Sequence, residues 1–247
     1  MAIKRKQIMI DDYFSQFKQD KFLNEVVFCN KKNGFFIDIG AYDGISFSNS
    51  LFFERSNDWS GICVEPNPLV FSKLVSLRKS INLNVCIGSE NKKVKFTQIE
   101  GYSEMLSGIA EEYDKRHIER INNNILIKGG KINEIEVDMI TLRDIDELKN
   151  KKIDFISIDT EGNEFEIVNS INFDFLDVKA LVVENNYKDN RIREHLNSIG
   201  FEYIYKLDCD EVFLNKLYFS FGIKTRLLFW KSKSLLMRKI NKMRSKL

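Results

Sequence analysis

The sequence predicts an α/β fold, in which helices flank a mainly parallel sheet that ends in an antiparallel strand pair. Two observations predict it. Short apolar segments alternate with helical segments along most of the chain, as they do where helices join the strands of a parallel sheet. Several apolar segments also end directly on a carboxylate or a glycine, at the sheet edge where such folds bind their ligands.

The first half of the chain predicts a helical lead-in and then strands and helices in alternation. Pro66 and Pro68 begin a helix, since proline is tolerated in a first helical turn. Gly88 closes the third strand, and the next segment alternates like a half-exposed antiparallel strand. The expected helices are Gln7–Phe28 (as one or two), Ser46–Arg55 and Leu69–Lys79, and the expected strands are Phe35–Ile39, Gly61–Val64, Leu83–Ile87 and Val94–Ile99.

The second half begins with an irregular, charged stretch and then returns to apolar strands. Two short apolar runs ending on Asp159 and Glu184 are typical of buried parallel strands. Gly200 supplies a helix C-cap before the final strand pair. The expected helices are Glu111–Arg120, Leu142–Leu148 and Arg191–Ser198, and the expected strands are Glu134–Thr141, Ile153–Ile158, Ala180–Val183, Phe201–Lys206 and Glu211–Leu214.

The composition is that of a soluble globular protein with one decorated domain. The 247 residues are 43% hydrophobic and 30% charged, and only 2 prolines and 12 glycines argue against long linkers. The four cysteines lie far apart, which favours small buried side chains over disulfides or a zinc site. No segment approaches the roughly 18 apolar residues of a membrane span. We therefore expect a cytoplasmic protein.

The segment FFIDIGAYDG is the strongest indication of a ligand. A buried strand runs into a turn that contains Gly40 and Gly44, and the second strand ends on Glu65. An acidic residue at that position accepts the ribose hydroxyls in nucleoside-binding α/β folds. The two features together predict a nucleoside cofactor.

The glycine spacing distinguishes between nucleosides. Dinucleotide binders use G-x-G-x-x-G, whereas this turn reads G-x-x-x-G with Asp38 and Asp43 beside it, where a diphosphate would meet negative charge. S-adenosylmethionine carries a sulfonium and an ammonium and no phosphate, so it suits the acidic turn better. A nicotinamide-dependent oxidoreductase stays open as an alternative, as does a tight turn with solvated aspartates and no ligand.

Five segments, in order, resemble the FkbM-type methyltransferases, which have the class I, Rossmann-like methyltransferase fold and use S-adenosylmethionine. Two departures concern the substrate: Ser157 stands where many members have lysine, and Arg143 stands where members often have aspartate. The similar segments are SQFKQDKFLNE (Ser15–Glu25), FFIDIGAYDGISFSNSLFFE (Phe35–Glu54), WSGICVEPNP (Trp59–Pro68), LSGI (Leu106–Ile109) and IDFISIDTEGNEFEIV (Ile153–Val168).

The resemblance implies a set of cofactor-binding residues. The backbone around Gly40 would lie against the methionine moiety and sugar, where a side chain would collide. Glu65 would accept both ribose hydroxyls, and Ser89 would lie near the adenine. The full set is Asp38, Gly40, Ala41, Tyr42, Asp43, Gly44, Glu65, Pro66 and Ser89.

The acceptor side is expected at the ends of two later strands. Asp159 and Glu161 are the candidate catalytic residues, and Asp159, Glu184 and Asn185 are candidate Mg²⁺ ligands, because hard oxygen donors at adjacent strand ends suit that ion. Two alternatives remain: a metal-free site in which Asp159 or Glu161 positions the hydroxyl or acts as a base, and a merely structural Glu161 at a helix N-terminus. His117 is a further candidate base, whereas His195 is expected on the surface.

The last 25 residues differ in charge from the rest. They carry nine basic residues and no acidic one, and since the whole chain has a net charge of +2, residues 1–222 are left at −7. We therefore divide the chain into a methyltransferase domain, 1–222, and a basic amphipathic tail, 223–247. Such a tail suits an anionic membrane at the inner face of the cell, although a helix docked on its own domain or a solvated tail would read similarly.

The expected function is O-methylation of a sugar hydroxyl on a glycan or a lipid-linked saccharide. The sugar is implied by the family resemblance alone. The alternatives are the oxidoreductase and a catalytically silent, membrane-associated scaffold of the same fold. Nucleic acid is not an expected partner, because the body is acidic and the basic residues of the tail are interleaved with bulky apolar ones.

Overall fold

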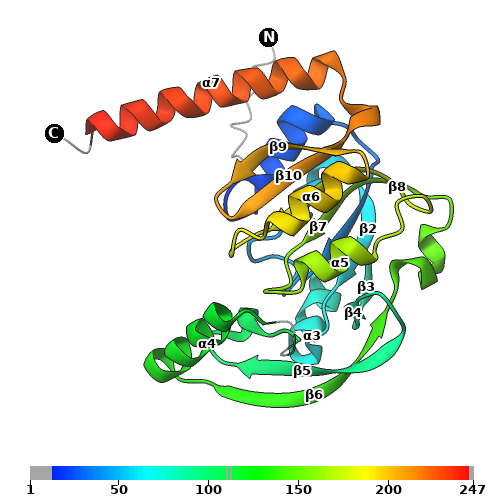
Figure 1. Ribbon diagram of the computed structural model, residues 1–247, viewed down its shortest axis with the longest axis vertical. Helices are drawn as coiled ribbons and strands as arrows, with labels where there is room; N and C mark the ends of the chain where they lie inside the picture. Colours follow the sequence, from blue (N-terminus) through cyan, green and yellow to red (C-terminus); the bar gives the residue numbers. More distant parts are fainter. Residues whose placement is uncertain (1–12, 110, 112, 245–247) are drawn as a thin grey trace, which may run out of the picture.

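The computed structural model describes residues 13–109, 111 and 113–244, and its centre is a seven-stranded sheet (Figure 1). The strand order is β3-β2-β1-β7-β8-β10-β9, and all neighbours are parallel except the pairs that β10 forms with β8 and β9. This confirms the predicted α/β architecture with its antiparallel end. The bounds are β1 Phe35–Ile39, β2 Ser60–Val64, β3 Ile81–Leu83, β7 Lys152–Ile158, β8 Asp177–Glu184, β9 Phe201–Leu207 and β10 Asp210–Asn215.

The central strands bury both faces, and alternate side chains enter two separate cores. In β1, Phe35, Ile37 and Ile39 enter one core, while Phe36 enters the other. The first core is covered by α5 (Glu164–Ser170) and α6 (Asn190–Ser198), which lie in front of the sheet in Figure 1.

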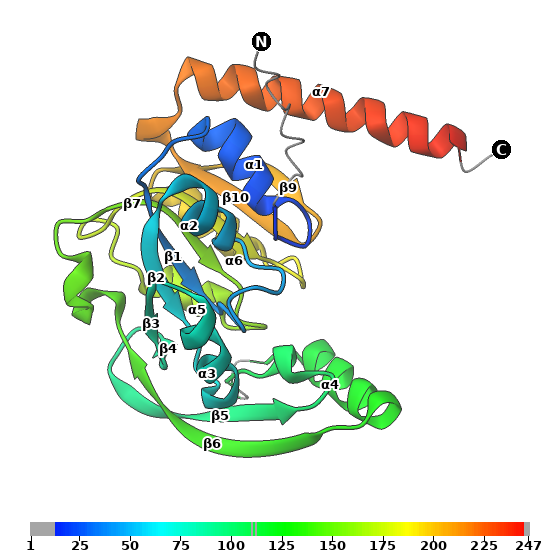
Figure 2. The same ribbon diagram turned by 180° about the vertical axis from the view of Figure 1, so that it is seen from behind.

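The opposite core is covered by a different set of helices, seen in front of the sheet in Figure 2. They include α1 (Gln19–Phe22), which continues as a π-helix over Leu23–Phe28, α2 (Leu51–Asn57) and α3 (Pro68–Leu77). The aromatic rings of Phe28, Phe53, Trp59 and Phe155 pack together in this core.

A second, three-stranded sheet forms a lobe at the carboxyl edge of the first. Its order is β4-β6-β5, with β4 Cys86–Ile87, β5 Lys92–Glu100 and β6 Lys131–Ile140, and α4 (Lys115–Lys128) joins β5 to β6. The single strand expected over Leu83–Ile87 is therefore wrong, because the chain leaves the main sheet after Leu83 and pairs Cys86 with β6.

Several expected helices differ in extent. The lead-in helix begins at Gln19, and the part expected over residues 7–12 lies outside the described residues. Within 46–55, Asp43 and Ser48 hold turns that delay the helix to Leu51. The charged helix begins at Lys115, where the Asp114 side chain caps it, and the segment 142–148 forms two 3₁₀ turns rather than one helix.

The basic tail begins as one long helix, α7 (Phe221–Arg244). The expected boundary after residue 222 therefore falls inside its first turn. Ile223 and Leu227 are buried in the same core that α1 and α2 cover. The far half of α7 extends past the body in Figures 1 and 2. Among the described residues, no helix combines the length and the apolar character needed to cross a bilayer.

Candidate functional site

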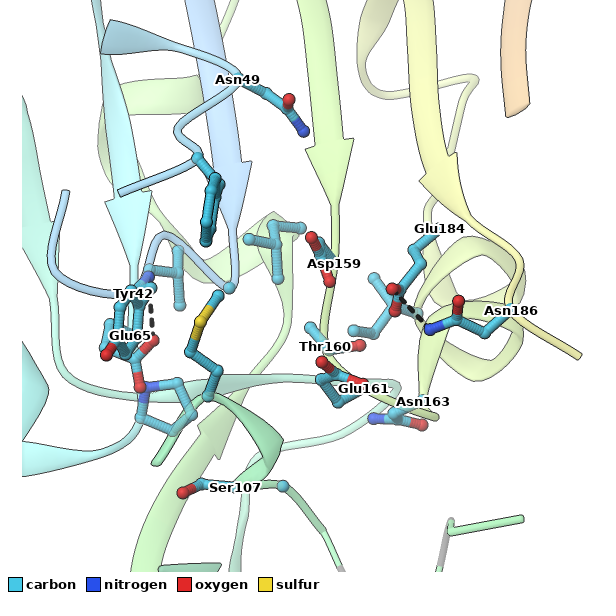
Figure 3. A pocket seen from close by; sticks show the side chains of 18 of the residues that line it. Tyr42, Asn49, Glu65, Ser107, Asp159, Thr160, Glu161, Asn163, Glu184 and Asn186 are labelled. Carbon is cyan, nitrogen blue, oxygen red and sulfur yellow. Dashed lines mark hydrogen bonds between the residues drawn. The ribbon is translucent and has the colours of Figure 1, made fainter. Parts of the chain in front are cut away.

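A cleft of about 310 Å³ opens at the carboxyl ends of β1, β2, β7 and β8. Figure 3 shows that it has two sides, with Tyr42 and Glu65 on one and Asp159, Glu161 and Glu184 on the other. The lead-in segment contributes Phe17, and the lobe contributes Glu104 and Met105. A cleft at the point where strands diverge is the usual ligand site of an open α/β sheet.

The turn after β1 requires glycine at position 40. Gly40 has φ +86°, and a Cβ built on it would lie 1.7 Å from the carbonyl oxygen of Asp159. The amides of Gly40 and Ala41 both donate to the carbonyl of Val64 at 3.0 Å. The first glycine of the motif thus allows β1 and β7 to present their loops side by side at the cleft.

Gly40→Ala should lower the melting temperature by at least about 4 °C and abolish binding of S-adenosylhomocysteine, because strain and collision displace both loops. Calorimetric titration and a thermal melt measure the two effects. Gly129→Ala is the matched control: its φ is +74°, but nothing lies within 4 Å of its added Cβ, so only strain is expected there. Normal cofactor binding by Gly40→Ala would contradict this account of the turn.

Glu65 ends β2 with its carboxylate buried in the cleft wall. Its two oxygens accept hydrogen bonds from the amides of Asn67 (2.8 Å) and Tyr42 (3.1 Å). Burial nevertheless raises the pKa of Glu65 to about 7. Each oxygen keeps a free lone pair, so the carboxylate can still accept a diol.

Tyr42 connects this side of the cleft to the lobe. Its backbone is left-handed (φ +50°), and its hydroxyl donates to Glu104 at 2.5 Å. Lys73 of α3 pairs with the same Glu104 carboxylate at 3.0 Å. The sequence did not single out Glu104, because only the folded lobe brings it next to the first glycine turn.

The other expected cofactor residues divide into lining and supporting positions. Pro66 lines the cleft, whereas Ala41 packs in the core behind it. Asp38 is buried and accepts from the Ser50 hydroxyl at 2.5 Å, so it supports the turn from beneath. Burial raises the pKa of Asp38. Gly44 lies against Leu74 and Arg78.

Asp43 and Ser89 do not line the cleft. Asp43 accepts from the amides of Ile45 and Ser46, which makes it a turn residue. Ser89 lies in a separate hollow beside Thr141 and Arg143, because the chain turns into the second sheet before reaching it. The expected position of Ser89 beside an adenine is therefore corrected.

The opposite side of the cleft is a cluster of carboxylates. Oxygens of Asp159, Glu161 and Glu184 all lie within 4.8 Å of one another. Burial and the charges of Asp210 and Glu161 raise the pKa of Asp159, and burial together with Asp159 raises the pKa of Glu184. Burial also raises the pKa of Glu161 to about 7. Such a cluster gains stability from a cation or a shared proton.

The expected ligand Asn185 faces away from this cluster. Its side chain bonds the backbone of Asp189, accepting at 2.6 Å and donating at 3.1 Å, and so shapes the turn after β8. The next residue, Asn186, lines the cleft and donates to Glu184 at 2.6 Å. Strand alternation cannot place two residues that lie beyond the end of a strand, which is why the sequence suggested the wrong amide.

Glu164 organises the turn that presents Asp159 and Glu161. Its carboxylate accepts from the amides of Thr160 (3.1 Å) and Gly162 (2.8 Å) at the start of α5. Glu161 itself has a left-handed backbone, with φ +59°. Glu164 is not among the site residues predicted from the sequence, although a glutamate at the beginning of a helix is a recognisable sign of such a cap.

The lobe reaches Glu161 through α4. Arg120 donates to Glu161 at 3.1 Å, and the Nδ1 atom of His117 lies 3.6 Å from the same carboxylate. His117 is fully buried, with its Nε2 atom 3.3 Å from the Leu106 carbonyl and Nδ1 3.3 Å from the Tyr187 hydroxyl. Burial lowers the pKa of His117, so the ring is neutral. His117 does not line the cleft and lies next to Glu161, so its role as a base stays a prediction.

Two buried amides add polar groups to the cleft. Asn49 donates to the Ser157 hydroxyl at 2.9 Å. The Oδ1 atoms of Asn49 and Asn163 are buried without a hydrogen-bond partner among the described residues, and both side chains line the cleft. A buried acceptor without a donor is a position that a ligand can satisfy.

A family comparison identifies a domain in this chain. The methyltransferase FkbM domain matches residues 38–203, a span that runs from the end of β1 into the start of β9. No curated protein is detectably similar in sequence.

Solved structures resemble the chain only distantly. Methyltransferase FkbM from Methylobacillus flagellatus is 13% identical with a TM-score of 0.40, and the match covers 75% of this chain and 44% of that protein. TrmK from M. capricolum, solved with S-adenosylhomocysteine, is 12% identical with a TM-score of 0.37, covering 78% and 67%. The N-terminal domain of human METTL16, also with S-adenosylhomocysteine, is 15% identical with a TM-score of 0.37, covering 78% and 66%.

Proposed function

Because the chain belongs to the methyltransferase FkbM domain family, we propose that it transfers a methyl group from S-adenosylmethionine to a hydroxyl of a glycan or lipid-linked saccharide. One observation carries the proposal: the Glu65 side and the carboxylate side face each other across a single cleft. A cofactor held by the first side would therefore present its reactive group to an acceptor held by the second.

The cofactor side fits S-adenosylmethionine in shape and charge. The backbone at Gly40 lines the cleft, where the methionine portion can lie against it, and Glu65 offers two oxygens to the ribose diol. When bound, the cofactor supplies an electrophilic methyl group. A nicotinamide dinucleotide fits worse, because its diphosphate would enter a cleft lined by the carboxylates of Glu65, Glu104 and Asp159.

The carboxylates would position the acceptor hydroxyl and take its proton. Glu161 is suited to this role because its pKa of about 7 lets it hold or release a proton near neutrality. Asp159, which follows the same strand β7, would accept a hydrogen bond from a second hydroxyl of the acceptor. Arg120 fixes Glu161 in place by a hydrogen bond, so the base does not have to reorganise during the reaction.

The lining of the cleft suits a sugar. Carboxylates accept from hydroxyl groups, while the amides of Asn49, Asn163 and Asn186 can both donate and accept. Phe17 and Phe47 add apolar rings at the same cleft, and flat apolar faces suit the carbon side of a sugar ring. A nucleic acid suits it less, since the carboxylate cluster would repel phosphates.

As an alternative to Glu161 acting as the base, we propose that Asp159, Glu161 and Glu184 bind a divalent cation such as Mg²⁺, a set in which Glu161 replaces the expected Asn185. Their oxygens lie close enough to share one ion. Independently of the cluster, the side chain of Asn163 lies beside Glu161 in Figure 3, and its Oδ1 atom has no hydrogen-bond partner among the described residues. A bound cation would lower the pKa of an acceptor hydroxyl.

About 10 mM Mg²⁺ or Ca²⁺ should raise the melting temperature of the protein by about 3 °C, because the ion binds only the folded cluster. This concentration is roughly tenfold above an assumed millimolar Kd. Differential scanning calorimetry measures the shift. Glu184→Gln should abolish it, whereas Glu136→Gln, at an exposed site on β6, should leave it unchanged. Cofactor binding without any cation effect would favour the metal-free site.

The methyl-transfer proposal is tested by incubating the protein with methyl-labelled S-adenosylmethionine and a panel of oligosaccharides and lipid-linked saccharides. Label in a sugar ether, formed only with intact protein, is the expected result. Binding of S-adenosylhomocysteine without transfer to any hydroxyl acceptor would contradict the proposed acceptor. Failure to bind it at all would favour the catalytically silent scaffold.

A further inference from the structure

Helix α7 has two apolar faces, and only one of them is used by the fold. Ile223 and Leu227 are buried in the core, and the Trp230 ring packs edge-on against Phe22 with 5.3 Å between ring centroids. Arg226 secures the same face by donating to the Val26 carbonyl at 2.8 Å. The spacing of three and four residues is that of one helical face docked on the π-helical segment.

The opposite face carries an exposed apolar row, here called the outer stripe. At about 100° per residue, positions seven apart return to nearly the same direction, which aligns the side chains of this row. The side chain of Phe229 is 72% exposed and that of Leu228 is 66% exposed. Several large apolar side chains exposed in one row are informative, whereas a single one is not. The outer stripe consists of Phe221, Leu228, Phe229, Leu235 and Leu236.

The polar residues inside the outer stripe are already satisfied. The hydroxyl of Thr225 donates to the Phe221 carbonyl at 3.0 Å, and that of Ser232 donates to the Leu228 carbonyl at 2.9 Å. These bonds to the preceding turn remove the need for water at the only hydroxyls of the row. The stripe can therefore enter an apolar medium without leaving an unpaired donor.

Basic residues border the outer stripe on both sides. Lys224 and Lys231 follow one edge, seven residues apart, and Lys233 lies on the other edge. Their long stems allow the charged ends to reach beyond the apolar row. No acidic residue occurs in residues 223–247.

We propose that the outer stripe docks on an anionic membrane surface, with α7 lying in the plane of the interface. An apolar row with lysines on both edges matches acyl chains below and anionic headgroups beside the helix. A second copy of the chain fits worse. Two stripes packed together would place the flanking lysines opposite one another, and the row is interrupted by Thr225 and Ser232 where a helical pair needs apolar residues.

The docked face links this surface to the cleft. The π-helical segment that receives α7 continues directly from α1, and Phe17 and Gln19 at its beginning line the cleft. Membrane binding would therefore hold the protein at the surface where the lipid-linked class of acceptor lies. This consequence rests on the proposed function, but the docking itself does not.

Flotation of the full-length protein with vesicles tests the docking. The parent protein should bind vesicles of phosphatidylcholine that contain about 30% phosphatidylglycerol, roughly the anionic content of a charged leaflet. It should bind vesicles of pure phosphatidylcholine far less. Leu228→Ser with Phe229→Ser and Leu235→Ser should lower the partition coefficient by about 100-fold. Lys224→Gln with Lys231→Gln and Lys233→Gln should lower it by a similar factor, about fivefold per charge.

Matched variants at the far lobe provide the controls. Leu126→Ser with Ile127→Ser removes equally exposed apolar groups from α4, and Lys115→Gln with Lys131→Gln and Lys152→Gln removes the same charge elsewhere. Both should float like the parent, and all variants should keep the parent's affinity for S-adenosylhomocysteine. Equal losses in the controls, no binding of the parent to anionic vesicles, or a dimer in light scattering that the stripe variant dissociates would each overturn the proposal.

Discussion

Glu65→Ala should weaken binding of S-adenosylhomocysteine by about 100-fold, because the variant loses a charge-assisted contact to both ribose hydroxyls. Isothermal titration of parent and variant measures the loss. The substitution also leaves the amides of Tyr42 and Asn67 without their acceptor, so the melting temperature of each protein is measured in parallel. Glu65→Gln, which keeps one carbonyl oxygen, should lose only about tenfold.

The protonation of the Glu65 carboxylate determines how the affinity for S-adenosylhomocysteine should change with pH. The raised pKa, about 7, means that the free protein holds a proton on Glu65 at pH 6 and has lost most of it at pH 8. Since the ionised form binds the diol better, affinity should rise with pH and approach tenfold per unit below pH 7. Glu65→Gln should remove this slope, and Glu136→Ala should preserve it. A slope unchanged in Glu65→Gln would assign the titration to another group.

Glu161→Gln should slow methyl transfer by about 100- to 1000-fold, because the amide cannot accept the proton of the acceptor hydroxyl. Initial rates with methyl-labelled S-adenosylmethionine and an accepted saccharide measure the effect. The affinity for S-adenosylhomocysteine should change by less than about twofold, since Glu161 lies across the cleft from the Glu65 side.

Glu166→Gln controls for the loss of one negative charge near this loop. Glu166 lies on α5, is exposed, and pairs at 3.8 Å with Arg191 rather than facing the cleft. It should transfer methyl groups at the parent rate. If Glu161→Gln also kept the parent rate, Glu161 would have only a structural role at the start of α5, and Asp159 would become the candidate base.

The same two faces of the cleft show how far local patterns can predict a site. Glu65, Asp159 and Glu184 could be placed together in advance, because each follows an apolar run and the carboxyl ends of parallel strands meet at one edge. Ser89 and Asn185 could not be placed in the same way. Each lies beyond a strand end, where the direction of the side chain depends on the turn rather than on alternation.

Contacts distant in sequence were equally out of reach. Glu104 meets Tyr42 from 62 positions away, and His117 and Arg120 approach Glu161 only because α4 folds back over the cleft. No pattern within a short window reports such contacts, since they depend on how the second sheet packs against the first. The split of the expected strand at Leu83 has the same origin.

The sequence by itself determined the α/β architecture, the two glycines of the first turn and the carboxylates at the strand ends, because periodicity and strand-end chemistry act over a few residues. Only the tertiary structure decided which amide reaches Glu184, which groups hold Glu161, and which face of α7 is left uncovered. Those outcomes depend on packing between segments far apart in the chain, where a side chain's partner is set by the whole fold rather than by its neighbours.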